Sequence, residues 1–306
     1  MSDIVTAASQ QPPPEAFVAE VESRLGGRTI AWTPPDTGLS AAMLFIVTLE
    51  DGRRVFLKAA TDAQTQSWLE NERLALEHAP AGMAPRVVGH FSAESGFSVL
   101  LTEALDGHWP ASHQGLDWRN RLDEAIAAIV RLSENTGPAV LPSAGNTPPA
   151  VRWAEGPLVE GAVQAGVASG GWFADHIPML RRAEASLDRS GSAFVHGDMR
   201  SDNVCLMADG PRFVDWSSAA RGAPETDLAA FLPAARLEGG PPPEAVLPRG
   251  GSWAAAQAAQ MAALAMGDAV PAWLSRVCWR LVVINLDWAV ASLGMDSRDG
   301  ARWEDL

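Results

Sequence analysis

Cysteine is scarce in this chain, and its scarcity excludes several classes of protein. Only two of the 306 residues are cysteines, Cys205 and Cys278, which are too few for a disulfide framework or for a metal site of their own. Both lie in apolar stretches, so we expect buried free thiols. The N-terminus lacks the basic start and the apolar stretch of a signal peptide. The longest apolar segment, residues 271–293, is interrupted by three charged side chains, which disfavours a membrane span.

Basic residues are also fewer than acidic ones. The chain has 23 Lys and Arg against 37 Asp and Glu, a formal net charge of −14. This balance argues against nucleic acid or an anionic membrane as the main partner. A cationic substrate is compatible with it, although ordinary solubility is the simpler explanation. With 47% hydrophobic residues, we expect a cytoplasmic globular protein whose oligomeric state the sequence leaves open.

One stretch carries most of the chemical information. Residues 196–203 read His-Gly-Asp-Met-Arg-Ser-Asp-Asn, and Asp215 follows in Phe-Val-Asp-Trp. The spacing D-x-x-x-x-N, from Asp198 to Asn203, is that of the catalytic loop of protein kinases. A carboxylate at the tip of such a loop can position an acceptor hydroxyl and take its proton, which is the role that we assign to Asp198. The alternative is a turn aspartate that bonds its own backbone.

Asn203 and Asp215 have the chemistry of magnesium ligands. Short apolar segments at 204–207 and 212–214, joined by a turn at 208–211, predict a hairpin that brings both side chains to the same end. Magnesium prefers a few hard oxygen ligands together with phosphate oxygens and water. A carboxylate in an apolar strand also needs a cation to compensate it. For Asn203 the alternative is a loop cap.

A lysine and a glutamate complete the pattern. Lys58 lies in the apolar strand expected at 54–59, where an ammonium can contact the α- and β-phosphates of a nucleotide. Glu72 shares the inward face of the next helix with Leu69 and Leu76. Because a charge on an apolar face usually has a partner, we predict a Lys58–Glu72 ion pair. A surface lysine and an unrelated helix acid are the alternative.

At these residues the chain resembles the aminoglycoside phosphotransferase and choline kinase families, which are kinase-like enzymes of small molecules. The loop begins His-Gly-Asp rather than the His-Arg-Asp of protein kinases, and Asp-Trp-Ser replaces Asp-Phe-Gly. The resemblance implies ATP and Mg²⁺ as cofactors and transfer of the γ-phosphate to a hydroxyl of a small molecule. Candidate acceptors are an aminoglycoside-like antibiotic, an amino alcohol, a sugar or an unknown metabolite.

The resemblance also implies roles for Glu103 and Asp227, and two neighbours of Asp198, namely His196 and Arg200, have expected roles of their own. Glu103 closes the segment that joins the lobes in such folds, where backbone groups meet adenine. Asp227 matches an Asp that opens a helix, which we interpret as a helix cap and as a brace for the catalytic loop. His196 is expected to anchor this loop by hydrogen bonds rather than to do acid–base work. Arg200 either meets a transferring phosphate or a substrate anion, or faces solvent.

A recognisable phosphate-binding motif is missing. Neither G-x-G-x-x-G nor a Walker A motif occurs. The best candidate is the segment 37–41, whose small residues let backbone N–H groups approach a phosphate and whose Ser40 offers a hydroxyl. A plain hairpin turn is the alternative. The small-molecule phosphotransferases commonly have a short, glycine-poor loop here, so the departure from protein kinases fits the resemblance.

The order of expected elements predicts an α+β, two-lobed, protein-kinase-like fold. A disordered tail (1–14) precedes an ATP-binding N-lobe (15–103) built on a small antiparallel sheet. A mostly helical C-lobe (104–306) carries the catalytic loop and binds the acceptor. One of its helices is expected at 253–266, with Ser252 as N-cap.

Two other functions and one further residue remain open. A Ser/Thr protein kinase is disfavoured by the missing glycine-rich loop and by the short segment between Asp215 and Asp227, which leaves little room for a peptide-binding activation segment. A nucleotide-binding pseudokinase is disfavoured because the reactive residues are all present. Carboxylates and tryptophans in the C-terminal helices suit a cationic or neutral polyol, with Asp287 as the predicted contact. Solvated acids and core tryptophans are the simpler alternative.

Overall fold

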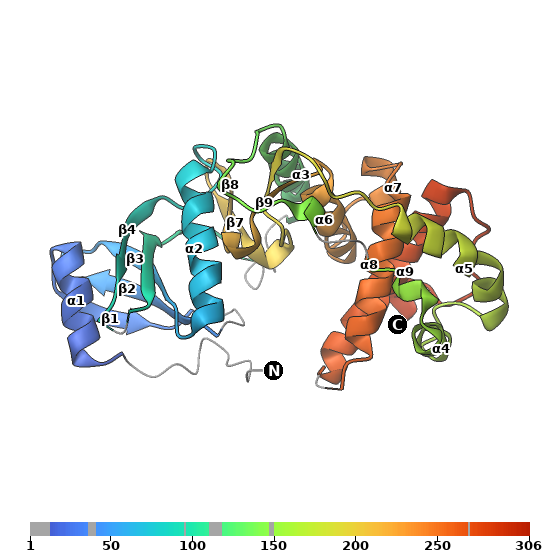
Figure 1. The fold of residues 1–306 in the computed structure, drawn as a ribbon, viewed down its shortest axis with the longest axis horizontal. Coiled ribbons are helices and arrows are strands. Elements are labelled where there is room, and N and C mark those ends of the chain that lie inside the picture. Colours follow the sequence, from blue (N-terminus) through green and yellow to red (C-terminus); the bar gives the residue numbers. More distant parts are fainter. Residues whose placement is uncertain (1–12, 36–40, 95, 110–117, 147–149, 269) are drawn as a thin grey trace.

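The computed structural model describes residues 13–306 apart from 36–40, 95, 110–117, 147–149 and 269. A sheet with two helices forms the N-terminal part, and a mostly helical part follows (Figure 1). The strands are β1 Thr29–Thr33, β2 Met43–Leu49, β3 Arg54–Ala59, β4 Val87–Ser92, β5 Ser98–Glu103, β6 Ala193–Val195, β7 Val204–Met207, β8 Gly210–Phe213 and β9 Ala220–Gly222. The α-helices are α1 Glu15–Leu25, α2 Ala63–His78, α3 Trp118–Ser133, α4 Gly156–Gln164, α5 Gly170–Ala185, α6 Thr226–Leu237, α7 Pro243–Val246, α8 Gly251–Ala265 and α9 Ala272–Leu293. Nearly all of the tail expected to be disordered lies outside the described residues.

The N-terminal sheet is a rigid platform for Lys58. Its five antiparallel strands have the order β1-β2-β3-β5-β4, and β3 has the predicted bounds. Asp51-Gly52 forms the hairpin turn between β2 and β3, with Gly52 at a φ of 84° that glycine adopts without strain. Apolar side chains of β2, β3 and β5 pack with α1 into one core, so the position of Lys58 in β3 is well defined.

Helix α2 stands between this sheet and the rest of the molecule (Figure 1). A capping box fixes the start of this helix. The Asp62 carboxylate accepts from the Thr65 N–H, and the Thr65 hydroxyl accepts from the Asp62 N–H. Leu69, Glu72 and Leu76 are buried on one face, as their helical spacing predicted. The helix therefore carries a charged side chain into an apolar layer, where it needs a partner.

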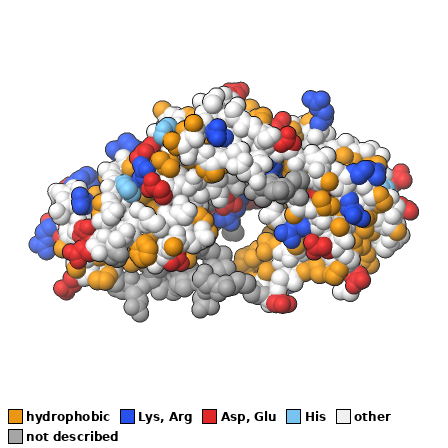
Figure 2. Space-filling view, viewed as in Figure 1, with side chains coloured by type: hydrophobic (Ala, Val, Ile, Leu, Met, Phe, Trp, Pro, Cys, Tyr) orange, Lys and Arg blue, Asp and Glu red, His pale blue; other side chains and the backbone are white. Residues whose placement is uncertain are grey.

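The helical part has two cores. Side chains of α3 and α6 pack with Phe194, Phe213 and Trp216 around the β7–β8 hairpin. A second core joins α4, α5, α8 and α9, which lie at the end of the molecule opposite the sheet (Figure 1). Figure 2 shows the surface hollowed between these two ends. Asp198, Asn203 and Asp215 come from the elements between these ends, while Lys58 comes from the sheet and Glu72 from α2.

One predicted helix start is wrong. The helix expected at 253–266 is α8, which begins at Gly251, and its N-cap is Gly250 rather than Ser252. The physical reason is close packing: a Cβ on Gly250 would lie 1.9 Å from the Trp288 ring of α9, so only glycine lets the two helices approach here.

Two expectations from composition can be compared with the structure. Cys205 and Cys278 are buried free thiols, as predicted. No helix in the described ranges combines the length and the apolar character needed to cross a membrane.

Candidate active site

The β7–β8 hairpin sets the positions of Asn203 and Asp215. The two strands pair along their whole length, and the Val214 N–H donates to the Asn203 carbonyl oxygen over 3.0 Å. The candidate ligands therefore leave the hairpin side by side, although the turn is tighter than predicted because β8 begins at Gly210. Among the described residues, Asp215 is the only non-glycine with a positive φ, 65°. Such a left-handed backbone is unfavourable for an aspartate and is typical of functional positions.

Lys58 lies between two carboxylates. Its Nζ is 2.8 Å from both oxygens of Glu72 and 3.0 Å from Oδ1 of Asp215. The predicted Lys58–Glu72 pair is confirmed, and the contact with Asp215 connects this pair to the hairpin. Burial of the ammonium lowers the pKa of Lys58, but Asp215 and Glu72 outweigh it, so the pKa is raised. The same ammonium lowers the pKa of Asp215 to about 2 despite desolvation, so both groups stay charged.

The segment from His196 to Asn203, called the catalytic loop below, presents Asp198 at its tip. The Asn203 amide Nδ2 donates to the Asp198 carbonyl oxygen over 2.8 Å and lies 3.3 Å from the Asp198 carboxylate. Since Nδ2 faces Asp198, the opposite amide atom, Oδ1, is the one that can meet a cation. The loop thus combines a partly exposed carboxylate with an oxygen ligand beside the hairpin.

His196 and Asp227 hold the start of this loop. The His196 ring is buried; Nε2 contacts the Val214 carbonyl oxygen at 2.9 Å, and Nδ1 accepts from the Asp198 N–H at 3.4 Å. The Asp227 carboxylate accepts from the N–H groups of His196 (2.6 Å) and Gly197 (2.9 Å). His196 is therefore an anchor and Asp227 a brace, as predicted.

The helix-cap role predicted for Asp227 is wrong. It lies in the first turn of α6, whose N-cap residue is Glu225, and its carboxylate is occupied by the catalytic loop. Burial raises the pKa of Asp227, while His196 lowers it.

Gly197 explains why the motif begins His-Gly-Asp. Its φ is 83°, and a Cβ at this position would lie 2.2 Å from the Ser218 carbonyl oxygen. A side chain would therefore be strained and would also push away the segment that follows Asp215.

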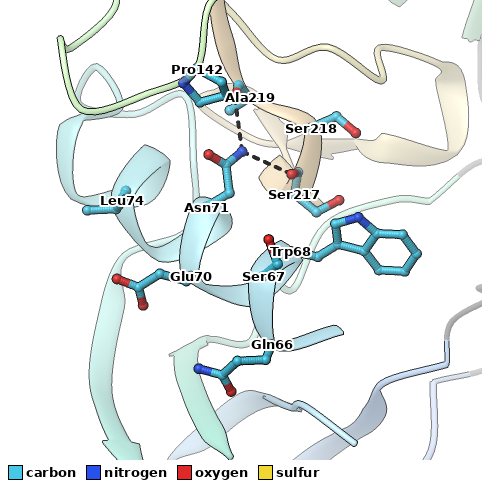
Figure 3. Close-up of a pocket in the computed structure, with 10 residues that line it drawn as sticks. All are labelled: Gln66, Ser67, Trp68, Glu70, Asn71, Leu74, Pro142, Ser217, Ser218 and Ala219. Atoms are coloured by element: carbon cyan, nitrogen blue, oxygen red, sulfur yellow. Dashed lines mark hydrogen bonds between the residues drawn. The ribbon is translucent and has the colours of Figure 1, made fainter. Parts of the chain in front are cut away.

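Asn71 of α2 holds this same segment from the other side. Its Nδ2 donates to the carbonyl oxygens of Ser217 and Ala219, both at 2.9 Å (Figure 3). A hollow of about 720 Å³ adjoins the contact and is lined by α2, Pro142 and residues 217–219. Sequence reasoning missed Asn71, because one polar residue on a polar helix carries no local signal.

Arg200 lies at the exposed side of the catalytic loop. Its guanidinium is 3.3 Å from the Asp198 carboxylate and 3.0 Å from that of Asp202, and all three side chains are about half exposed. Burial raises the pKa of Asp202, an effect that Arg200 opposes. The structure therefore places a cation beside the predicted base, and it adds Asp202 as a carboxylate that the sequence analysis did not consider.

Three predicted site residues either lie away from Lys58, Asp198 and Asp215 or cannot be placed. Ser40 falls outside the described residues. Glu103 ends β5, and its carboxylate accepts from the Arg86 N–H at 2.9 Å. Asp287 forms a two-point ion pair with Arg298, whose guanidinium also donates to the carbonyl oxygens of Val167 and of Ala301 in the C-terminal segment. The contacts of Asp287 thus belong to the anchoring of that segment.

The site contains few candidate metal ligands. In the described part of the chain, no group of three or more His, Cys, Asp and Glu side chains could hold a metal ion by itself. Asn203 and Asp215 offer hard oxygens from neighbouring positions of one hairpin. That set fits Mg²⁺, which commonly takes only one or two protein ligands beside substrate phosphates and water.

A sequence model of the phosphotransferase enzyme family (APH) matches residues 31–280. The chain belongs to this family. The predicted kinase-like fold and the predicted enzyme class, a phosphotransferase of small molecules, are thereby confirmed. Among curated proteins, none matches the chain.

Solved structures share the fold of this phosphotransferase at low identity. A Thermobifida fusca protein assigned as a fructosamine-3-kinase is 21% identical, with a TM-score of 0.50 over 92% of this chain and 100% of its own. A thermostable mutant of aminoglycoside phosphotransferase APH(4)-Ia is 16% identical, with a TM-score of 0.52 over 90% of this chain and 96% of its own. Amicoumacin kinase hAmiN is 14% identical, with a TM-score of 0.50 over 90% and 94%. At these identities the similarity supports the fold alone.

Proposed function

We propose that this phosphotransferase moves the γ-phosphate of ATP, in a Mg²⁺-dependent reaction, to a hydroxyl of a small molecule. One observation carries the proposal: Lys58 is held by Glu72 and Asp215 directly beside a loop that presents Asp198 and Asn203. A cation, two oxygen ligands and an exposed carboxylate are the parts that phosphoryl transfer needs, because its catalysis consists mainly of positioning and charge stabilisation.

The N-lobe, residues 15–103, is proposed to bind the nucleotide. Lys58 meets the α- and β-phosphates, and backbone groups near Glu103 meet adenine. Asn203 and Asp215 hold Mg²⁺, which neutralises charge on the phosphates when bound. Ser40 in the segment between β1 and β2 stays a predicted phosphate contact.

The C-lobe, residues 104–306, is proposed to bind the acceptor. Asp198 accepts the proton of the attacking hydroxyl, for which its exposed position is suited. Arg200 stands next to it, within reach of a transferring phosphate. Of the three tryptophans on α9, Trp273 is 60% exposed, Trp279 is partly buried against the helical core and Trp288 is fully buried, so Trp273 is the most accessible for stacking on a ligand.

The relatives support the coarse substrate class. The APH(4)-Ia mutant has been crystallised with ADP and hygromycin B, and amicoumacin kinase with AMP-PNP, Ca²⁺ and its ligand. We therefore propose a hydroxylated, neutral or cationic acceptor: an aminoglycoside-like antibiotic, an amino alcohol, a sugar or another metabolite. A protein substrate is disfavoured, because α6 begins soon after Asp215 and leaves little chain for a peptide-binding segment.

A screen of small hydroxyl compounds with labelled ATP tests the proposal. We expect label transfer to at least one compound, only in the presence of Mg²⁺, with equal release of ADP. Transfer to a protein substrate alone would favour the protein kinase. ATP binding without transfer to any compound would favour a nucleotide-binding pseudokinase.

A further inference from the structure

Helix α6 contacts the catalytic loop at both of its own ends. At the N-terminal end, Asp227 accepts from the N–H groups of His196 and Gly197, as described above. At the C-terminal end, the C-cap residue Glu238 accepts from the Ser201 hydroxyl over 2.5 Å. The first contact holds the start of the loop, and the second holds the part between Asp198 and Asn203.

The surroundings of the Glu238 carboxylate stabilise this contact. Its second carboxylate oxygen accepts from the Trp118 indole N–H of α3 over 2.5 Å, so each oxygen has a donor. Ser201 and Trp118 are 9% and 7% exposed, which shields both hydrogen bonds from water. Burial raises the pKa of Glu238, and the hydrogen bonds from Ser201 and Trp118 oppose that rise.

The backbone around Glu238 is fixed as well. Its N–H donates to the carbonyl oxygens of Ala234 (3.3 Å) and Ala235 (3.1 Å), and the Gly240 N–H donates to Ala235 at 2.8 Å. Leu228, Phe231 and Leu232 bury the same helix in the core beneath the loop. The carboxylate is therefore presented from a rigid support.

We propose that Glu238 is a positioning residue of the phosphotransferase, acting through the Ser201 hydroxyl to set the distance between Asp198 and Asn203. The inference rests on the proposed function, which makes one of these residues the base and the other a metal ligand. Ser201 starts a 3-10 turn that ends at Asn203, and the Asn203 N–H donates to the Arg200 carbonyl oxygen at 3.0 Å. Without its hydroxyl contact this turn can shift, and a misplacement of about 1 Å can cost ~10²-fold in rate.

The test compares Glu238→Ala, Glu238→Gln and Ser201→Ala, with Glu225→Gln as the matched control, an exposed carboxylate at the other end of α6. We expect Glu238→Ala and Ser201→Ala each to lower kcat by about 10- to 100-fold with little change in the KM for ATP. Glu238→Gln retains one acceptor oxygen and should recover part of the rate. The double variant should be no slower than Glu238→Ala, because both changes remove one contact. Losses that multiply in the double variant, or a lower Tm with kcat unchanged well below it, would overturn the proposal.

Hydrogen exchange gives a second readout that needs no acceptor. In Glu238→Ala and Ser201→Ala, amides of residues 201–203 should exchange about tenfold faster, the change expected for loss of one hydrogen bond to a charged acceptor. Amides of His196 and Gly197, which Asp227 holds, should keep their protection. Equal loss of protection in both parts of the loop, or in neither, would contradict the inference. If the unmodified enzyme transfers no phosphate to any acceptor, the proposed function fails, while this exchange experiment still decides the role of Glu238.

Discussion

The two ends of the candidate active site are built differently. At the end that we propose binds the nucleotide, called the nucleotide end, Lys58 and Glu72 have side chains 16% and 6% exposed, and their contacts are 2.8 Å long. At the acceptor end, Asp198 and Arg200 are 44% and 50% exposed and lie 3.3 Å apart. Buried ion pairs are strongly coupled to their surroundings, whereas exposed pairs contribute little and rearrange easily. On the proposed function, the nucleotide end is therefore preassembled, and the acceptor end is the one that can rearrange around its ligand.

The most severe test of this comparison is Asp215→Ala. It removes the proposed charged metal ligand and one of the two partners of Lys58, so Mg²⁺-dependent nucleotide binding and phosphate transfer should both be abolished. Calorimetry with and without Mg²⁺ measures the first, and a labelled-ATP assay the second. Asp215→Asn is the control for shape, since it keeps the volume and removes the charge. Unchanged affinity for Mg·ATP in Asp215→Ala would mean that the metal is held elsewhere.

Asp198→Asn should impair the acceptor end and leave the nucleotide end unchanged. The change removes the proposed proton acceptor and preserves the shape of the loop tip, so kcat should fall about 10²–10⁴-fold. ATP affinity should stay near that of the unmodified enzyme, because Asp198 does not touch Lys58 or Glu72. Steady-state kinetics with a verified acceptor and nucleotide titration measure the two quantities. Turnover near the unmodified level would remove Asp198 from the role of base.

The Lys58–Glu72 pair tests whether the nucleotide end acts as one unit. Each single alanine variant should lower kcat/KM for ATP, and their effects should not add, with a coupling of about 0.5–3 kcal/mol. Glu72→Ala should cost less than Lys58→Ala, because Lys58 keeps its contact with Asp215. Glu70→Ala is a matched control, since Glu70 lies on the same helix but pairs with Arg73 at 2.6 Å. Fully additive losses in the double variant would show that the pair does not work as a unit.

A structural feature could be predicted from the sequence where the residues that determine it lie close together in the chain. β3 has its predicted bounds because turn residues bracket a short apolar run. The Lys58–Glu72 pair was also predictable, because a charge on an apolar helix face needs a partner. The start of α8 was misplaced, because the choice of Gly250 over Ser252 depends on close packing against α9.

The supporting residues of the site were harder to find. Glu238 ends a helix next to two glycines, and nothing near it in sequence indicates that Ser201 and Trp118 are its partners. Asn71 likewise depends on a segment far along the chain. Sequence reasoning therefore located residues with reactive side chains and missed those that position them, because positioning is a property of the tertiary structure.

Asn71→Ala should have a smaller effect than the changes above. It removes the two hydrogen bonds that tie α2 to the segment after Asp215, each worth about 1 kcal/mol. We expect the KM for ATP to rise about tenfold, since Lys58, Glu72 and Asp215 are held across this junction. Ser67→Ala, on α2 and lining the same hollow, is the control and should behave like the unmodified enzyme. A fall in kcat at unchanged KM for ATP would place the contribution of Asn71 at the acceptor end instead.

The smallest effect on activity is expected for Asp287→Ala. This variant tests whether the acceptor end extends to α9. The sequence suggested that Asp287 contacts the acceptor, which predicts a raised acceptor KM at an unchanged KM for ATP. The structure pairs its half-exposed carboxylate with Arg298, at 2.8 Å, so we expect the main cost to be structural. Because the Arg298 side chain is only 5% exposed, loss of its carboxylate partner should cost on the order of 1–3 kcal/mol, measurable as a lower Tm, with both KM values and hence the activity unchanged. Asp296→Ala, which removes a nearby exposed carboxylate, controls for the change in net charge. If Asp287→Ala instead raises the acceptor KM severalfold while the control does not, the acceptor end reaches α9. The exposed, adaptable end of the site would then include the helices at the far end of the helical part.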